Sequence, residues 1–323
     1  MLRLVLLLLL IAPGARAAGP EDRAAGFTTA FADWLDQAGA EAGILALSYN
    51  GRPVAVWSRG RAAEDVVDLA SLSKAVTAVC IAALVDEGLL YYDNSAREVL
   101  GLPEAAPVTI AALLSHATGL HSDYTQGPMT FWKGNPTPRW GEITPRALDP
   151  ARLSPGEAGY YYSNENYAVL GTVIEKATGQ SYETACRERV LVPAGIGGRA
   201  SDAFAAYLPW GGWAMRMADY ARFVDYAFGT GGVLTDRLEE LPGVAITGPV
   251  SYGMGMVQRD MGPGRGRNVW HFGALCFEGG PNFGTYAVHW ETGWTVAAWY
   301  DICATEVDMG ALDAAMAGVA YTK

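Results

Sequence analysis

Apolar and polar positions at the start of the chain predict one helix followed by strands. Residues 21–37 place large apolar side chains three and four positions apart, which predicts an amphipathic helix. Residues 43–49 and 53–57 have the composition of strands, and Asn50-Gly51 between them is a strong hairpin signal. Another short strand is expected before Ser71.

The middle of the chain, roughly residues 71–245, has a mostly helical pattern. Residues 75–85 are too rich in apolar positions for a surface helix, so they predict a buried helix that ends near Gly88. Residues 121–159 contain six prolines and predict a long irregular segment of the kind that forms a rim or lid. Further helices are predicted at residues 110–116 (Thr109 as N-cap, Gly119 as stop), 167–178, 182–190 and 213–228.

After residue 245 the period changes from helical to extended. Strands are predicted at residues 252–258, 268–276, 285–290 and 294–300, followed by a closing helix at 305–321. Strands near both ends, on either side of a helical insert, indicate the α/β class in an α+β arrangement. We expect one antiparallel sheet built from both chain ends, about residues 18–70 and 246–323, flanked by helices, with a helical part at about 71–245.

The first 17 residues have the features of an export signal. A basic start precedes a short apolar core, and an Ala-x-Ala site follows at residues 15–17. The apolar core is too short to cross a bilayer, so an uncleaved anchor is the weaker alternative. The prediction is a signal peptide at residues 1–17 and a secreted or periplasmic domain at 18–323, with no membrane span after cleavage.

Charge and cysteines narrow the possible partners and cross-links. The formal net charge is −11, which argues against nucleic acid and anionic membranes as partners. Export permits disulfides. Cys276 and Cys303 could meet across neighbouring strands, whereas Cys80, inside an apolar helix, is interpreted as a packing residue, and the pairing that includes Cys186 is left open. The four histidines show no metal-site spacing, so no metal is expected.

The most informative chemistry lies at the head of the buried helix, where Ser71 precedes Lys74 by three residues. That spacing puts both side chains on one helix face. A serine hydroxyl needs a base to become a good nucleophile. Burial at a helix start lowers the pKa of a lysine, so Lys74 is a candidate base for Ser71. The motif alone is weak, because an N-cap serine followed by a surface lysine has the same spacing.

Two distant stretches have chemistry that complements this pair. Tyr162-Ser163-Asn164 supplies a phenol, which can shuttle a proton if a nearby lysine lowers its pKa, and an amide that can orient a carbonyl group. The stretch from Trp270 to Gly273 lies on a predicted strand, and its glycine permits close approach of a substrate to the backbone. Each is weak by itself, since an N-cap and a packed histidine are the ordinary interpretations.

Taken in order, these stretches resemble the serine β-lactamase and penicillin-binding protein superfamily, in its class C-like branch. Residues 69–74 resemble its nucleophile motif, residues 113–120 a companion segment, and Tyr162-Ser163-Asn164 its Tyr-x-Asn motif. His271-Phe272-Gly273 resembles the third motif, which is Lys-Thr-Gly in class C lactamases and His-x-Gly in several relatives. The resemblance covers about residues 30–300 and implies the β-lactamase/transpeptidase-like fold.

The resemblance also implies catalytic and substrate-binding roles. Ser71 attacks an ester or amide carbonyl to form an acyl-enzyme, and Lys74 and Tyr162 share the proton transfers, with the base left open between them. The backbone N–H groups of Ser71 and Ala274 form the oxyanion hole. The substrate-binding residues implied are Asn164, His271, Gly273 and Ala274. No cofactor is implied, and the partner is a small-molecule or peptidoglycan-like substrate.

Departures from the motifs leave the substrate open. His271 replaces a lysine, Phe272 replaces a hydroxyl residue that binds a substrate carboxylate, and Glu165 stands where a small turn residue is common. We therefore expect an esterase-like hydrolase, and any activity on carboxylate substrates to rise as His271 gains a proton towards pH 6. The alternatives are a D-Ala-D-Ala carboxypeptidase or class C-like β-lactamase, and a catalytically silent binding or scaffold protein. The oligomeric state is left open.

Overall fold

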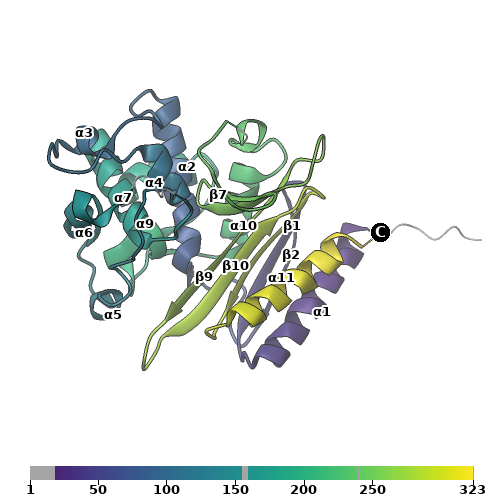
Figure 1. Ribbon diagram of the computed structural model, residues 1–323. Helices are drawn as coiled ribbons and strands as arrows, with labels where there is room; N and C mark the ends of the chain where they lie inside the picture. Colours follow the sequence, from purple (N-terminus) through teal and green to yellow (C-terminus); the bar gives the residue numbers. More distant parts are fainter. Residues whose placement is uncertain (1–18, 155–158, 239, 323) are drawn as a thin grey trace, which may run out of the picture.

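The computed structural model describes residues 19–154, 159–238 and 240–322 (Figure 1). The predicted signal peptide therefore lies outside the described residues. Within them, helices and strands form the predicted mixture of a large sheet and a helical lobe. None of the helices in the described part of the chain is both long and apolar enough to cross a membrane.

The sheet has eight antiparallel strands and joins the two ends of the chain. β1 pairs with β11 along its whole length, so that Gly43 faces Tyr300 and Tyr49 faces Trp294. This pairing confirms the predicted sheet built from both ends. In spatial order the strands are β2 (Arg52–Arg59), β1 (Gly43–Tyr49), β11 (Trp294–Tyr300), β10 (Asn282–His289), β9 (Arg267–Cys276), β8 (Met256–Asp260), β7 (Val250–Gly253) and β6 (Val244–Thr247).

One face of the sheet is covered by the first and last helices of the described chain, α1 (Pro20–Ala38) and α11 (Glu306–Ala320), which lie side by side (Figure 1). The predicted apolar stripe of α1 forms its buried side. Phe31 and Trp34 pack there with Tyr300 of β11 and Leu312 of α11. Because alternate residues of a strand point to opposite faces, the neighbouring strand residues face the helical lobe.

The other face of the sheet meets the helical lobe. At its centre is α2 (Ser73–Asp86), whose side chains are buried almost all round, as the apolar pattern predicts. The remaining helices are α3 (Ala96–Leu100), α4 (Ile110–Ser115), α5 (Met129–Trp132), α6 (Trp140–Ala147), α7 (Asn164–Thr178), α8 (Tyr182–Cys186), α9 (Leu208–Gly211) and α10 (Met217–Phe228). Short 3₁₀ turns are η1 (Ala70–Leu72), η2 (Pro150–Arg152), η5 (Ala205–Tyr207) and η6 (Thr235–Arg237), and η4 (Arg187–Leu191) is a π-helical segment that continues α8.

Two predicted elements are wrong for a tertiary reason. The helix expected at residues 213–228 begins only at Met217, because β5 (Trp213–Met215) is extended and pairs with β3 (Val67–Asp68) and β4 (Arg199–Ala200). Residues 252–258 form two strands, β7 and β8, which turn at Gly255. A Cβ at Gly255 would lie 2.6 Å from the Ala75 backbone, so this turn packs directly on α2.

The proline-rich segment is less irregular than predicted. α5, α6 and η2 all fall within residues 121–159, and Pro150 occupies the first turn of η2, a position that needs no backbone N–H.

α4 ends at Ser115, earlier than expected. His116, with a φ of 58°, takes the left-handed conformation that terminates this helix, three residues before Gly119.

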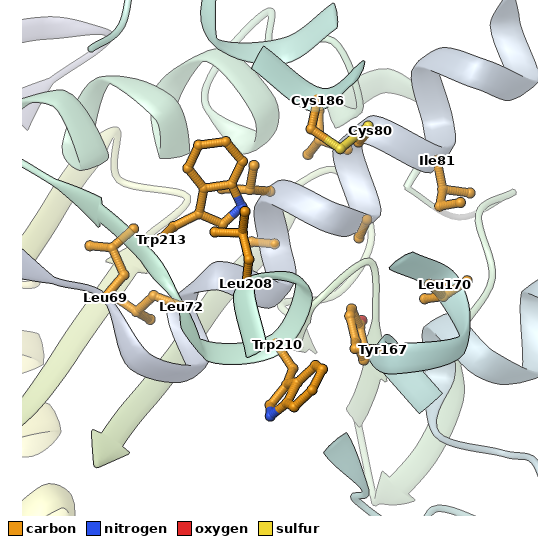
Figure 2. Packing of buried hydrophobic residues seen from close by; sticks show 14 of the residues in the cluster. Leu69, Leu72, Cys80, Ile81, Tyr167, Leu170, Cys186, Leu208, Trp210 and Trp213 are labelled. Atoms are coloured by element: carbon orange, nitrogen blue, oxygen red, sulfur yellow. A yellow bond between two sulfur atoms is a disulfide. The ribbon is translucent and has the colours of Figure 1, made fainter. Parts of the chain in front are cut away.

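Two disulfides connect the described cysteines. Cys276 at the end of β9 is bonded to Cys303, in the loop after β11, so this predicted pair forms, although β10 separates the two strands. The interpretation of Cys80 as a packing residue is wrong, because it is bonded to Cys186 of α8 (Figure 2). The sequence pattern shows that Cys80 is buried but does not show that α8 lies against it.

Candidate active site

Ser71 lies in the turn η1, which leads directly into α2. The preceding residue, Ala70, has a φ of 48°, a conformation that is uncommon for a residue with a side chain and is found preferentially at functional turns. Leu69 holds this turn from two sides: its N–H donates to Trp213 O of β5 at 2.9 Å, and its carbonyl accepts from Thr285 Oγ1 of β10 at 2.8 Å. The nucleophile candidate is thus placed by both parts of the molecule.

Lys74 is fully buried directly behind Ser71. Its Nζ donates to Ser71 Oγ at 3.2 Å and to Trp210 O at 2.9 Å. Burial lowers the pKa of Lys74 from 10.5 to about 7, and the Asp123 carboxylate partly opposes that shift. At neutral pH a large fraction of the amine is therefore uncharged and able to accept the Ser71 proton.

Ser73, the other serine of the motif, has a different environment. It is fully buried, and its hydroxyl accepts a hydrogen bond from Trp213 N at 3.1 Å. Figure 2 shows how closely apolar side chains, among them Leu72 and Trp213, pack around this end of α2. Ser73 therefore links α2 to β5.

Tyr162 lies beside this pair, with its ring centroid 4.8 Å from Lys74 Nζ. The Tyr162 hydroxyl is buried and makes no hydrogen bond of ordinary geometry with a described residue. Burial raises the pKa of Tyr162 well above 10, while the neighbouring Ser71 hydroxyl acts in the opposite direction. The condition named for a proton shuttle, a pKa lowered by a nearby lysine, is therefore not met: the phenol keeps its proton and can act as a donor.

His116, a residue for which the sequence suggested no role, holds the Tyr162 segment in three ways. Its carbonyl accepts from Tyr161 N at 3.0 Å, and its Nδ1 accepts from Ser163 N at 3.3 Å and from the Asn166 amide at 2.9 Å. Its ring lies 4.5 Å from the Tyr162 ring. Burial and the charge of Lys74 lower the pKa of His116, so it is neutral, with its proton on Nε2.

Asn164 is the first residue of α7, and a network centred on Asp123 fixes its position. The Asp123 carboxylate accepts from the backbone N–H of Asn164 at 3.2 Å and from the Thr125 hydroxyl at 2.7 Å. Because the Thr125 proton goes to Asp123, its oxygen accepts from Asn164 Nδ2, at 3.0 Å. No signal in the sequence connected Asp123 or Thr125 to the site, since the contacts span about forty residues.

The unexpected Glu165 has a structural explanation. Its carboxylate is completely buried and accepts two hydrogen bonds from the Arg152 guanidinium, at 2.6 and 2.8 Å. It also accepts from Tyr124 N at 3.0 Å. The residue that departs from the motif therefore ties α7 to both ends of the segment that carries Asp123 and α5.

β9 forms the opposite wall and approaches Ser71 at Gly273. A Cβ at Gly273 would lie 2.9 Å from both Ser71 N and Leu69 O, so only glycine fits there. β8 pairs with β9 only at residues 267–270, which leaves the edge from His271 onward without a strand partner among the described residues. Ala274 follows on this open edge, next to the Ser71 backbone.

His271 and Phe272 lie on opposite faces of β9. The Phe272 ring stacks on Tyr286 at 4.6 Å, on the side of α1 and α11, whereas His271 faces the pocket and its Nε2 lies 3.3 Å from the Tyr252 hydroxyl. Burial and the nearby Lys74 lower the pKa of His271 to about 3. The expected gain of carboxylate activity towards pH 6 therefore loses its basis, because His271 stays neutral there.

All seven residues predicted for the site meet at one pocket, six of them in its lining and Lys74 directly behind Ser71. The pocket has a volume of about 410 Å³, and none of its described lining residues is Asp, Glu, Lys or Arg. A larger hollow of about 900 Å³ lies near Gly19 and Tyr49 and contains none of these residues. The lining consists of Ser71, Gln126, Met129, Thr130, Tyr162, Asn164, Trp210, Gly211, His271, Phe272, Gly273, Ala274, Leu275, Cys276, Phe277 and Met309.

Comparison with known protein families gives a match over most of the chain. The family model described as Beta-lactamase matches residues 27–300. Penicillin-binding protein 4* of Bacillus subtilis is 35% identical over 136 residues, which are 41% of this chain and 30% of that protein. The chain thus matches about a third of the length of the curated relatives.

Solved structures show the same fold at low sequence identity. The D-amino acid amidase from Ochrobactrum anthropi SV3, complexed with D-phenylalanine, superposes with a TM-score of 0.75 at 18% identity, covering 93% of this chain and 100% of the amidase. The D-alanine carboxypeptidase AmpC from Burkholderia cenocepacia has a TM-score of 0.70 at 16% identity, covering 93% of this chain and 99% of that one.

Proposed function

The chain belongs to the Beta-lactamase family, and on that basis we propose that it is a serine hydrolase that forms an acyl-enzyme at Ser71. The observation that carries this proposal is the contact of 3.2 Å between Lys74 Nζ and Ser71 Oγ. A lysine whose pKa is lowered to about 7 can take the serine proton near neutral pH, which is what an active serine requires. A non-catalytic scaffold has no need for a buried lysine in that position.

The surrounding groups support a complete reaction. Neutral Lys74 accepts the Ser71 proton as Oγ attacks the substrate carbonyl, and the backbone N–H groups of Ser71 and Ala274 stabilise the resulting oxyanion. Tyr162 gives its proton to the leaving group and regains one from Lys74. Water then attacks the acyl carbon and gives one proton to Lys74, which passes it to Ser71 Oγ as the ester bond between Oγ and the acyl group breaks. Asn164 orients the substrate.

The substrate we propose is an uncharged ester or amide, so that the protein is esterase-like. β-Lactams and D-Ala-D-Ala peptides present a carboxylate, which would need a charged partner when it is desolvated. The described lining offers no lysine or arginine, and His271 is neutral. An uncharged substrate loses nothing in such a pocket. The pattern of residues 1–17 supports the further proposal that the protein acts after export.

A D-Ala-D-Ala carboxypeptidase or class C-like β-lactamase is the second candidate, since one structural neighbour is named as a D-alanine carboxypeptidase. A fluorophosphonate probe followed by peptide mapping tests the serine hydrolase itself, with a single labelled serine, Ser71, expected. Initial rates on p-nitrophenyl acetate, nitrocefin and a D-Ala-D-Ala peptide test the substrate. Faster turnover of nitrocefin or the peptide would contradict the esterase proposal, and absence of labelling would favour the scaffold.

A further inference from the structure

The pocket changes character along β9 on the two sides of Gly273. Because strand side chains alternate, His271, Gly273 and Leu275 point to the same face, and all three are buried. Phe277, the first residue after β9, is buried too and lines the same pocket. Gly273 lies against Ser71. On one side of this point are His271 and Tyr162, which carry polar atoms. On the other side are Leu275 and Phe277, which are apolar.

Side chains from three further elements form another wall of the pocket. Met129 of α5 and Trp210 of α9 are buried and in contact, with Trp210 Nε1 lying 3.5 Å from Met129 Sδ. Met309 of α11 also lines the pocket. Two polar residues, Gln126 and Thr130, complete this wall, and the Gln126 amide already donates to Asp123 at 2.9 Å.

Phe277 lies at the far end of the apolar side of the pocket, beyond Leu275, and its ring is held from two directions. Its ring stacks on Phe204 with centroids 6.0 Å apart, and the Lys133 ammonium lies 5.1 Å from its centroid. Lys133 also donates to the carbonyl of Gly280, in the turn that follows. The Cys276–Cys303 disulfide ties the same strand end to the segment before α11. With a rise of about 3.3 Å per residue, the end of β9 at Cys276 lies roughly 10 Å from Gly273, and Phe277 follows directly after it.

The position of the proton donor decides which part of the substrate occupies each half. The leaving group must lie next to the group that protonates it, and Tyr162 and Lys74 are on the polar side of Ser71. The acyl group must then extend in the other direction, along Leu275. We propose that this half is a subsite for an uncharged, apolar acyl group, and that Phe277 limits the length of the chain that fits.

The inference rests on the proposed serine hydrolase activity, so its test varies only the acyl chain. Wild-type protein is given p-nitrophenyl acetate, butyrate, hexanoate, octanoate and the hemisuccinate, all with one leaving group. From acetate upward, kcat/KM should rise by about fourfold per buried methylene and then fall once the chain reaches Phe277. The hemisuccinate, which is close in length to butyrate but charged, should react at least tenfold more slowly than butyrate.

Phe277→Ala should move the optimum to a longer ester, and Phe277→Leu, which disturbs packing less, should move it in the same direction by a smaller amount. Phe131→Ala is the matched control, because Phe131 is 84% exposed on α5 and does not line the pocket. A flat series, a preference for the hemisuccinate, or an equal shift in Phe131→Ala would overturn the subsite while Ser71 labelling still upheld the hydrolase. Absence of labelling would overturn both, and unchanged preference in folded Phe277→Ala and Phe277→Leu would remove Phe277 from the proposal.

Discussion

The two faces of the large sheet bury different kinds of side chain. Under α1 and α11 the cluster is built from apolar and aromatic residues such as Phe31, Trp34 and Trp294. On the opposite side, next to Ser71, the protein buries Lys74, His116 and Glu165. Apolar burial stabilises a fold, whereas burial of ionisable groups opposes it unless they are paired or neutral.

This difference explains how the fold can hold buried ionisable groups next to Ser71. The apolar residues under α1 and α11, together with those packed around α2, supply the stability that allows the protein to hold a lysine with a pKa of about 7 and a histidine with a pKa of about 3. Substitution of the ionisable groups near Ser71 should therefore reduce activity with little loss of stability. Substitution of the apolar residues under α1 and α11 should reduce stability with little loss of activity.

Replacing Ser71 should give the largest loss of activity. Ser71→Ala removes the nucleophile, so turnover should fall by about 10⁴-fold or more and probe labelling should disappear. The melting temperature should barely change, because the Ser71 hydroxyl is partly exposed and contributes little packing. Ser73→Ala is the matched control: it loses the bond to Trp213 N and about 1 kcal/mol of stability, but should keep labelling. Labelling retained in Ser71→Ala would place the nucleophile elsewhere.

Replacing Lys74 should lower activity and raise stability at the same time. In Lys74→Met, kcat/KM should fall by about 10³-fold or more, while the free energy of unfolding should rise, because a fully buried amine is replaced by an apolar side chain of similar length. The folded-state pKa lies below the value for the unfolded chain, so the unfolded state binds the proton more tightly. The cost of burial is thus fully present below about pH 7 and disappears as pH rises towards 10.5.

The stabilisation by Lys74→Met should accordingly be larger at pH 6 than at pH 10, as measured by chemical denaturation at both values. The activity of the wild-type protein should also depend on pH through the protonation of Lys74. Since the neutral amine is the active form, kcat/KM should rise with pH through about 7. A flat profile between pH 6 and 8 would be evidence against Lys74 as the base.

Tyr162 tests whether the proton-transfer groups act as one unit. Tyr162→Phe keeps the ring beside Lys74 and removes only the hydroxyl, which we expect to cost about 10²- to 10⁴-fold in kcat. If Lys74 and Tyr162 work together, Lys74→Ala, Tyr162→Phe and the double variant should lose similar amounts of activity. Single losses that multiply in the double variant would show that the two residues act independently.

His116 should have a smaller effect, through position alone. His116→Phe keeps a ring against Tyr162 but leaves Ser163 N and the Asn166 amide without their acceptor. We expect kcat to fall about tenfold with KM little changed, and His116→Gln, whose side chain can still accept a hydrogen bond, to recover part of the loss. Equal loss in both variants would show that packing, rather than the hydrogen bonds, is what matters.

A substitution on the other face completes the comparison, with the smallest effect on turnover. Phe31→Ala opens a cavity under α1 and should cost about 3–5 kcal/mol of stability. The rate per folded molecule, determined by active-site titration with the fluorophosphonate probe, should equal that of the wild type. A loss of turnover comparable to that of His116→Phe would mean that the two faces are coupled.

The local pattern of residues was enough to predict the order of elements and the chemistry of the nucleophile motif. Periodicity is a local property, so the hairpin at Asn50-Gly51 and the buried helix after Ser71 could be predicted from it. The sheet that joins the two chain ends was expected from the order of the elements, with strands on both sides of a helical insert. The likeness of Ser71, Lys74 and Tyr162 to a known arrangement was readable for the same reason. Each of these motifs lies within a short stretch of the chain, so its residues can be recognised without knowledge of the fold.

The surroundings of those residues, by contrast, depend on long-range contacts that local patterns do not contain. The bond from Thr285 to Leu69 joins residues 216 positions apart, and the disulfide of Cys80 spans 106 positions. The pKa directions of Tyr162 and His271 follow from burial, which depends on all neighbouring elements together. Trp213 is extended for the same reason, because pairing with β3 and β4 outweighs its local helical pattern. Such contacts depend on which elements pack together, and the periodicity of a segment does not show its packing partners.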